Sequence, residues 1–257
     1  MFERFCSLAP VWQALASSLF MWSMTAAGAA AVFFFKNKNK YVMPWMIGTA
    51  AGVMTAASFW SLLLPASEMC GELAFSAPAV LTLGFLSGGA LLFLCDAAFA
   101  KSEKSTEARS AMLVFSVTLH NIPEGLCAGV AFGALAYDLP GSTLAGALLL
   151  ALGIGLQNFP EGAAISLPLW QGGFSRRRAF FMGQLSGAVE PPFAVLGALL
   201  VMSVRALLPF SLSFAAGAMI YVVAAELLPE CREQKTVAAL AVTVGFSAMM
   251  LMDTVFG

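Results

Sequence analysis

Eight long apolar segments run through this chain, and their length limits the folds open to it more than any other feature. Each has the roughly 20 apolar residues that a helix needs to cross a bilayer core of about 30 Å. Only 11% of the 257 residues are charged, against about 25% in a soluble domain. The sequence therefore predicts an all-α, polytopic membrane protein, surrounded by lipid bilayer. Its eight transmembrane helices are expected at about 9–35, 41–65, 78–100, 111–137, 143–170, 179–203, 209–230 and 236–256.

The basic residues predict how these helices are oriented. Only Arg4 and Arg205 lie apart from the others, which all fall in alternate connections between the segments. Cytoplasmic loops carry an excess of Lys and Arg, so we expect those connections in the cytoplasm and both termini on the extracellular or periplasmic side. The residues that carry this prediction are Lys36, Lys38, Lys40, Lys101, Lys104, Arg109, Arg176, Arg177, Arg178, Arg232 and Lys235.

Charge and cysteine usage exclude other classes of protein. A net charge of -1 argues against nucleic acid as a partner. The five cysteines lack CxxC spacing, so neither a structural zinc cluster nor a disulfide framework is expected. The connections are short and carry no His-rich tract. We therefore expect one transmembrane domain over residues 1–257.

Two similar hexapeptides lie in the fourth and fifth segments. Residues 120–125 read HNIPEG and residues 157–162 read QNFPEG. In each, the first polar residue and the Glu are four apart, and the Asn and the Glu three apart, so the side chains share one face of a helix. Each proline lacks an N–H and disrupts the bond to the carbonyl four residues back. The pattern predicts two kinked helices that face each other across a pocket.

Three glutamates are expected at one depth in the bilayer. At 1.5 Å per residue, His120 and Glu124 lie roughly 14–20 Å along the fourth helix. Gln157 and Glu161 reach a similar depth from the opposite side, and Glu190 reaches it from the sixth segment. The sequence therefore predicts one polar layer near the bilayer midplane, between helices 4, 5 and 6.

The charge of this layer predicts the kind of ligand. An ionised carboxylate at the bilayer centre costs about 3 kcal/mol or more, and no Lys or Arg accompanies Glu124, Glu161 and Glu190 in the three segments. A cation, or protons, must compensate them. Carboxylate, amide and imidazole groups suit Zn²⁺, Fe²⁺, Mn²⁺ or Co²⁺, and the absence of cysteine from both motifs argues against Cu⁺. Enough ligands are present for two ions.

Other interpretations of the same residues stay open. A single buried histidine is often a hydrogen-bonded core residue, and one intramembrane Pro-Glu can be a structural kink with a protonated acid. A proton-coupled transporter of an organic cation would use the same acids as a relay, although it would favour aromatic walls. An intramembrane metalloenzyme is less favoured, because HExxH is absent and one histidine is few for a hydrolytic zinc site. We therefore do not expect an enzyme.

Further polar residues mark a candidate pathway. Glu68 and Asp253 lie at the outer ends of segments 2 and 8, where they can collect cations or simply be solvated. Asp96 and Glu226 lie within the inner parts of segments 3 and 7 and are candidates for an exit relay, with pairing to nearby Lys or Arg as the alternative. On segment 2, Ser61 and Met54 are one heptad apart and can approach the pocket, although a methionine at such a position is more often a core residue than a soft ligand.

The whole chain resembles the ZIP (ZRT/IRT-like) family of divalent metal transporters, in particular its bacterial GufA-like branch. The similarity rests on the two hexapeptides and on GQLSGAVEPP at 183–192, with support from 50–68 and 216–230. It implies a ZIP-like domain of eight helices with both termini outside. It also implies import of zinc, or of Fe²⁺, Mn²⁺, Co²⁺ or Cd²⁺, as the transported substrate, with no organic cofactor, through the bacterial inner (cytoplasmic) membrane.

The resemblance further implies a set of metal ligands. One metal position would be formed by His120, Glu124, Gln157 and Glu161 with Met54 close by, and a neighbouring one by Asn121, Glu124, Asn158, Glu161 and Glu190. Helices 1, 4, 5 and 6 would move as a block against helices 2, 3, 7 and 8, giving alternating access in a homodimer.

Overall fold

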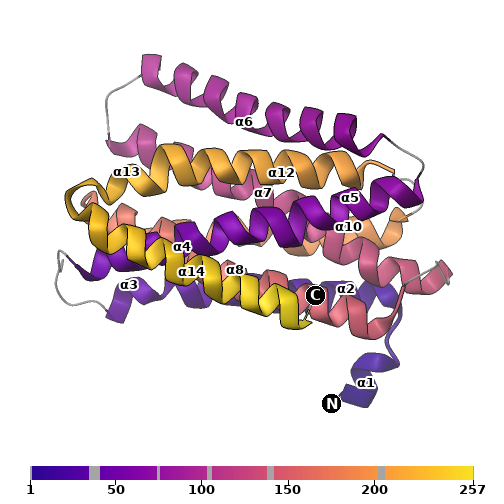
Figure 1. The fold of residues 1–257 in the computed structure, drawn as a ribbon. Coiled ribbons are helices and arrows are strands. Elements are labelled where there is room, and N and C mark those ends of the chain that lie inside the picture. The colour runs from indigo at the N-terminus through magenta and orange to yellow at the C-terminus, as the bar shows by residue number, and fades with distance from the viewer. Residues whose placement is uncertain are drawn as a thin grey trace.

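The computed structural model describes residues 2–34, 41–73, 76–102, 106–137, 142–201 and 206–256. Within these ranges the chain is almost entirely helical and contains no strand. After the short helix α1 (Phe2–Cys6), the helices run roughly side by side as a bundle, with both termini toward the same end (Figure 1). The predicted all-α fold is confirmed.

Within these described ranges, the helical elements join end to end into eight rods. Four rods are single α-helices over most of their length, three contain a short π-helical or 3₁₀ segment within the rod, and the first is divided at Ala30 into two α-helices. In chain order the rods are α2 (Pro10–Ala29) with α3 (Ala31–Phe34); α4 (Val42–Ala57), the π-helix η1 (Ser58–Leu63) and α5 (Leu64–Glu72); α6 (Ala77–Ser102); α7 (Thr106–Ala134) with η2 (Leu135–Tyr137); α8 (Leu144–Gln171); α9 (Arg176–Leu185), the 3₁₀ turn η3 (Ser186–Val189) and α10 (Glu190–Leu199); α12 (Leu208–Val222), the π-helix η4 (Val223–Leu227) and α13 (Leu228–Glu230); and η5 (Arg232–Gln234) with α14 (Lys235–Phe256).

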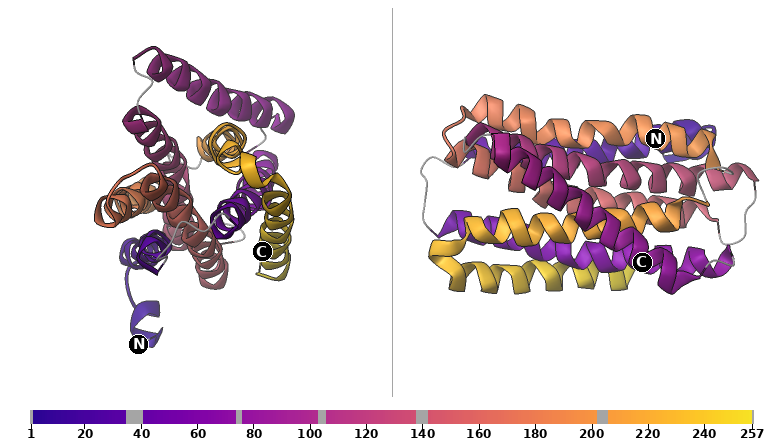
Figure 2. Two further views of the ribbon diagram at one scale, coloured as in Figure 1. Left: turned by 90° about the vertical axis from the view of Figure 1, so that its left-hand side faces the viewer. Right: turned by 90° about the horizontal axis from the view of Figure 1, so that it is seen from above.

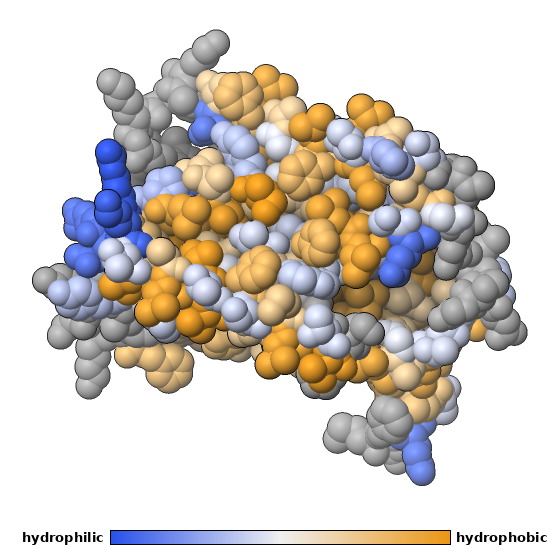
Figure 3. Space-filling view, viewed as in Figure 1, coloured by the Kyte–Doolittle hydropathy of each residue, from blue (hydrophilic) through white to orange (hydrophobic). Residues whose placement is uncertain are grey.

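Among the described residues, six helices are long and apolar enough to span a membrane. They are Pro10–Phe34, Pro44–Gly71, Ala77–Ala98, Leu144–Gln171, Leu208–Leu227 and Arg232–Met252. The other two rods, α7 and α9–α10, carry Asn121, Glu124 and Glu190 of the predicted layer, and these polar residues lower their hydropathy. Hydrophobic side chains cover the middle of the face shown in Figure 3, and hydrophilic ones gather mainly near its ends. The chain is therefore a multi-pass membrane protein.

Glycines let the rods approach each other in four close pairs. In each pair, a glycine on one helix lies so near the backbone of its neighbour that an added Cβ would overlap a carbonyl oxygen. The neighbouring helix has a glycine that lies equally close to the backbone of the first. Small residues of this kind permit tight helix packing in membranes. The reciprocal glycines are Gly28 and Gly162 for α2–α8, Gly129 and Gly197 for α7–α10, Gly52 and Gly245 for α4–α14, and Gly88 and Gly217 for α6–α12.

The four pairs fall into two sets. The first set, α2, α8, α7 and α9–α10, carries both hexapeptides and Glu190, whereas the second consists of α4–α5, α6, α12 and α14. Seen along the bundle, α6 and α14 lie at the periphery (Figure 2). The two sets meet where α7 packs on α12 and α8 packs on α4. The polar layer is thus built on one set of helices and faces the other across this junction.

The prolines of the two hexapeptides lie inside uninterrupted helices. α7 continues through Pro123, and α8 continues through Pro160 and Pro168. The helical geometry also changes in the sixth rod, where η3 is a 3₁₀ turn directly before Glu190. Two further changes occur at the π-helices η1 and η4, each followed closely by a proline, Pro65 or Pro229.

Candidate metal centre

Six polar side chains from three rods meet in the interior of the first helix set. Each of the six is at most 1% exposed. α7 supplies two of them, α8 three and α10 one. They are Asn121, Glu124, Gln157, Asn158, Glu161 and Glu190. Because polar side chains are rarely buried together without partners, their hydrogen bonds decide what this layer can do.

Two amides bridge the rods by donating to carboxylates. Gln157 Nε2 donates to Glu124 Oε1 at 2.5 Å, which joins α8 to α7. Asn158 Nδ2 donates to Glu190 Oε1 at 2.8 Å, which joins α8 to α10. A hydrogen bond to a carboxylate is among the stronger ones in proteins. The two neighbouring amides of α8 therefore hold one glutamate on either side.

Backbone carbonyls also accept hydrogen bonds from two of the side-chain amides. Asn121 Nδ2 donates to the carbonyl oxygen of Ser186 at 3.0 Å, within the 3₁₀ turn η3. Asn158 Nδ2 also donates to the carbonyl of Met21 on α2, at 3.3 Å. Since the NH₂ groups face these fixed acceptors, the orientation of each amide is set and its oxygen points elsewhere.

Five buried oxygens in this layer have no hydrogen-bond partner within the part of the chain that the structure describes. An acceptor left in this way costs about 1–3 kcal/mol, so five together mark the layer as unsatisfied by the protein alone. All belong to carboxylates or to side-chain amides. They are Asn121 Oδ1, Glu124 Oε2, Gln157 Oε1, Asn158 Oδ1 and Glu190 Oε2.

The three carboxylates also act on one another. Glu124 interacts electrostatically with both Glu161 and Glu190, and Glu190 with Glu161. The sequences of α7, α8 and α10 place no Lys or Arg among them. Oxygen acceptors and negative charge in one buried layer form an environment for a cation, which would satisfy the oxygens and offset the repulsion.

Two predicted ligands, His120 and Met54, are not among the six polar side chains of the layer. His120 lies in α7 one turn before Glu124, but its side chain is outside the described part of the structure. Met54 is buried on α4, in the large apolar cluster at the junction of the helix sets. Among the described residues, no three His, Cys, Asp or Glu side chains gather as a ready set of metal ligands. The amide oxygens are therefore candidate ligands beside the carboxylates.

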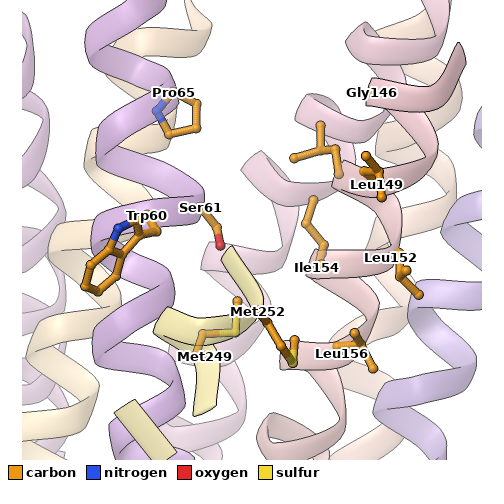
Figure 4. A pocket seen from close by; sticks show the side chains of 12 residues that line it. Trp60, Ser61, Pro65, Gly146, Leu149, Leu152, Ile154, Leu156, Met249 and Met252 are labelled. Atoms are coloured by element: carbon orange, nitrogen blue, oxygen red, sulfur yellow. The ribbon is translucent and has the colours of Figure 1, made fainter. Parts of the chain in front are cut away.

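Ser61 lines a cavity between the two helix sets. The cavity has a volume of about 220 Å³ and lies between the second rod, α8 and α14. Figure 4 shows Ser61 and Met252 facing Ile154 and Leu156 across it. Leu156 directly precedes Gln157, so the cavity reaches the neighbourhood of the polar layer. Of the other two residues predicted at this end of the bundle, Glu68 is exposed on α5, and the Asp253 side chain is outside the described part.

The two acids predicted for an exit relay lie near a tyrosine that the sequence did not single out. Tyr221 OH donates to Asp96 Oδ2 at 3.1 Å and links α12 to α6. Glu226 lies in the π-helix η4 and interacts electrostatically with Tyr221. All three side chains are half-buried. Nothing in the spacing of Tyr221 indicated this position, because the contact is made across two helices.

Comparisons with known proteins agree with this architecture. The family model described as "ZIP Zinc transporter" matches residues 96–253. The chain is 36% identical to zinc transporter ZIP11 of Homo sapiens, with 96% of this chain and 98% of that protein covered. It is 33% identical to zinc transporter GufA of Myxococcus xanthus, over 95% of this chain and 98% of the relative. Zinc transporter ZIPB of Bordetella bronchiseptica is 34% identical, over 91% and 78%. The match over nearly all of its length places this multi-pass membrane protein in the ZIP family of zinc transporters.

Proposed function

We propose that this protein carries zinc ions across a membrane through the buried carboxylate and amide layer, with the ion as its substrate. The observation that carries the proposal is the set of five buried oxygens without hydrogen-bond partners among the described residues. A divalent cation supplies what these oxygens lack, because carboxylate and amide oxygens are ligands for borderline and hard cations. Relatives that match almost the full chain bear the name zinc transporter, which supports the same substrate and a transporter, not an enzyme.

Two adjoining ion positions follow from the arrangement of ligands. His120, Glu124, Gln157 and Glu161, with Met54 nearby, form the first in this proposal. The second uses the opposite edge of the layer and shares two carboxylates with the first. Its ligands are Asn121, Glu124, Asn158, Glu161 and Glu190. The unpartnered oxygens of Gln157 and Asn158, on adjacent residues of α8, support this division.

The ion would reach and leave the layer along opposite paths. Ser61, Glu68 and Asp253 form the outer path, with the cavity beside Ser61 as its deepest part. Asp96 and Glu226 form the inner path. Because all six described polar side chains of the layer are enclosed, transport requires the layer to open to each side in turn. The division into two helix sets that meet along one junction supports such alternating access.

The direction and location belong to the same proposal. The basic connections on one side support cytoplasmic loops and both termini outside. We infer zinc import into the cytosol through the cytoplasmic membrane of a bacterium, by a homodimer. Fe²⁺, Mn²⁺, Co²⁺ and Cd²⁺ are further substrates that the ligand set can accept.

Uptake of labelled zinc into vesicles that contain the purified protein tests the proposal. We expect saturable uptake that Glu124→Ala and Glu161→Ala abolish. Cys95→Ala should leave it unchanged, since Cys95 lies on α6 away from the layer. No uptake by the unmodified protein in either orientation, or full uptake by Glu124→Ala, would overturn the proposal.

Thermal unfolding separates zinc transport from the rival use of the same acids as a proton relay. A zinc carrier is stabilised by zinc, because a ligand that binds only the folded state adds to its stability. The zinc-dependent rise in Tm should vanish in Glu124→Ala and persist in Cys95→Ala. Stabilisation by an organic cation and indifference to zinc would favour the rival.

A further inference from the structure

A buried thiol lies one helical turn from the central glutamate of the polar layer. Cys127 follows Glu124 by three residues on α7, so the two side chains share a face of the helix. Cys127 is 9% exposed and is a free cysteine. It interacts electrostatically with Glu124, whose Oε2 is fully buried and accepts no hydrogen bond from the described residues. A soft donor and an unsatisfied oxygen donor thus lie one turn apart on one helix face.

The position of Cys127 along α7 places it toward the cavity. α7 and α8 run in opposite directions, so residues after Glu124 and residues before Gln157 lie toward the same end of the bundle (Figure 1). On α8 the cavity is lined by residues that precede Gln157, including Gly153 and Ile154. Cys127 therefore lies on the cavity's side of the carboxylates.

Other sulfur atoms lie along the same route. Met249 and Met252 line the cavity between α8 and α14. Met54 belongs to the same buried cluster as Cys127, where α4, α7 and α12 meet. Single buried methionines are ordinary core residues. Together with a thiol one helical turn from an unsatisfied carboxylate, the two cavity methionines place soft donors on the side of the layer that faces the cavity.

We propose that Cys127 is a specificity-determining residue, which offers its sulfur to the ion held by Glu124 and favours soft divalent cations such as Cd²⁺ and Zn²⁺ over Mn²⁺. The inference rests on the proposed function for its consequence in transport, but its binding step stands on the geometry of α7. Thiolate ligands select softer metals, whereas carboxylates and amides serve harder ones. Coordination replaces the S–H proton by the metal ion, and that proton is released to water.

Cadmium binding to purified protein tests the binding step directly. Cd²⁺–thiolate bonds give a charge-transfer absorption in the ultraviolet that oxygen ligands do not give. In a variant with the other four cysteines replaced by alanine (Cys6, Cys70, Cys95 and Cys231), we expect Cd²⁺ to produce this absorption. Adding Cys127→Ala should abolish it. Absorption that survives Cys127→Ala, or that never appears in the Cys127-only protein, overturns the inference.

Competition between metals in vesicles tests the consequence for transport. We expect Cys127→Ala and Cys127→Ser to lower the ratio of Cd²⁺ to Mn²⁺ uptake by roughly tenfold, the scale of a lost contact at a metal site. Cys95→Ala should leave the ratio unchanged, and a merely structural role of Cys127 would lower both uptakes equally. If the vesicles show no uptake of any metal while the absorption depends on Cys127, the proposed function fails and the thiol site stands.

Discussion

At the residue scale, the site depends on the different roles of the nitrogen and the oxygen in each side-chain amide. The nitrogen of Asn158 holds Glu190 Oε1 and the carbonyl of Met21, and the nitrogen of Gln157 holds Glu124 Oε1. The oxygen of each amide is buried and has no hydrogen-bond partner among the described residues. An amide in this role fixes a carboxylate and adds a neutral ligand without adding charge. This explains how three glutamates can share a layer that contains no Lys or Arg.

Replacing Asn158 by aspartate tests this division. Asn158→Asp removes the donor to Glu190 and sets two carboxylates side by side. We expect the ion-free protein to lose roughly 1–3 kcal/mol of unfolding free energy, because an acceptor loses its donor and like charges meet. The zinc-dependent rise in Tm should grow, since a divalent cation gains a charged ligand. Thermal unfolding with and without zinc measures both.

Asn121→Asp is the matched control, because Asn121 donates to the carbonyl of Ser186 and not to a carboxylate. It should lose its hydrogen bond without creating a direct pair of carboxylates. An ion-free loss equal to or greater than that of Asn158→Asp would contradict the account.

Most residues of this site could be predicted from the sequence, but the pairing of amides with glutamates could not. Spacings of three and four residues placed Asn121 with Glu124, and Asn158 with Glu161, on shared helix faces. Which amide meets which glutamate depends on the rotation and axial shift between helices, and these are set by packing across rods. The same limit explains why spacing alone singles out neither Tyr221 nor Cys127.

At the element scale, reciprocal glycines replace side-chain packing by contact between backbones. An added Cβ at Gly129 of α7 would overlap the carbonyl of Ala194, and one at Gly197 of α10 would crowd Leu126. This contact fixes Glu124 and Glu190 relative to each other. The helices themselves were predictable from apolar length, but the pairing was not, since a glycine in a membrane helix does not show which neighbour it meets.

Alanine at Gly129 should therefore separate the two helices that carry these glutamates. Overpacking of this kind costs roughly 1–3 kcal/mol, and we expect Gly129→Ala to lose that much stability together with most of its zinc-dependent stabilisation. Gly71→Ala is the control, because its Cβ would meet nothing within 4 Å. Unfolding in detergent measures the difference, and equal stability of the two variants would count against the backbone contact.

At Gly153, which lines the cavity, we expect a substitution to reduce zinc uptake without reducing stability. An added Cβ at this glycine meets nothing within 4 Å. We expect Gly153→Leu to keep the fold and the zinc-dependent rise in Tm, because the layer itself is untouched. Zinc uptake should fall severalfold, because the side chain fills the space beside Ser61. Uptake equal to that of Gly71→Leu would show that the cavity is not part of the path.

At the scale of the whole molecule, the arrangement separates a polar, ion-binding set of helices from a more apolar set. The first set holds all six described polar side chains of the layer. In the second set, α6 and α14 lie at the periphery of the bundle (Figure 2). Orientation is the property that most needs measurement, because the helix count places both termini together but does not assign a side of the membrane.

Reporter fusions settle this orientation. A reporter joined after Arg178 should register as cytoplasmic, because Arg176, Arg177 and Arg178 form one of the basic connections. One joined after Ser142, in the preceding connection, should register on the other face. Reversed signals at both points would overturn the proposed direction of the paths.

The reduced hydropathy of α7 and α9–α10 has a consequence for biogenesis. Polar residues at the centre of a helix oppose its partitioning from the translocon into lipid. Because α7 and α10 both pack against α2, which precedes them in the chain, we expect their insertion to depend on α2 being in the membrane first. Assembly of the nascent chain therefore depends on the order in which its helices enter the membrane. A substitution that disrupts α2 should impair insertion of α7 and α10 during synthesis, before any ion is bound.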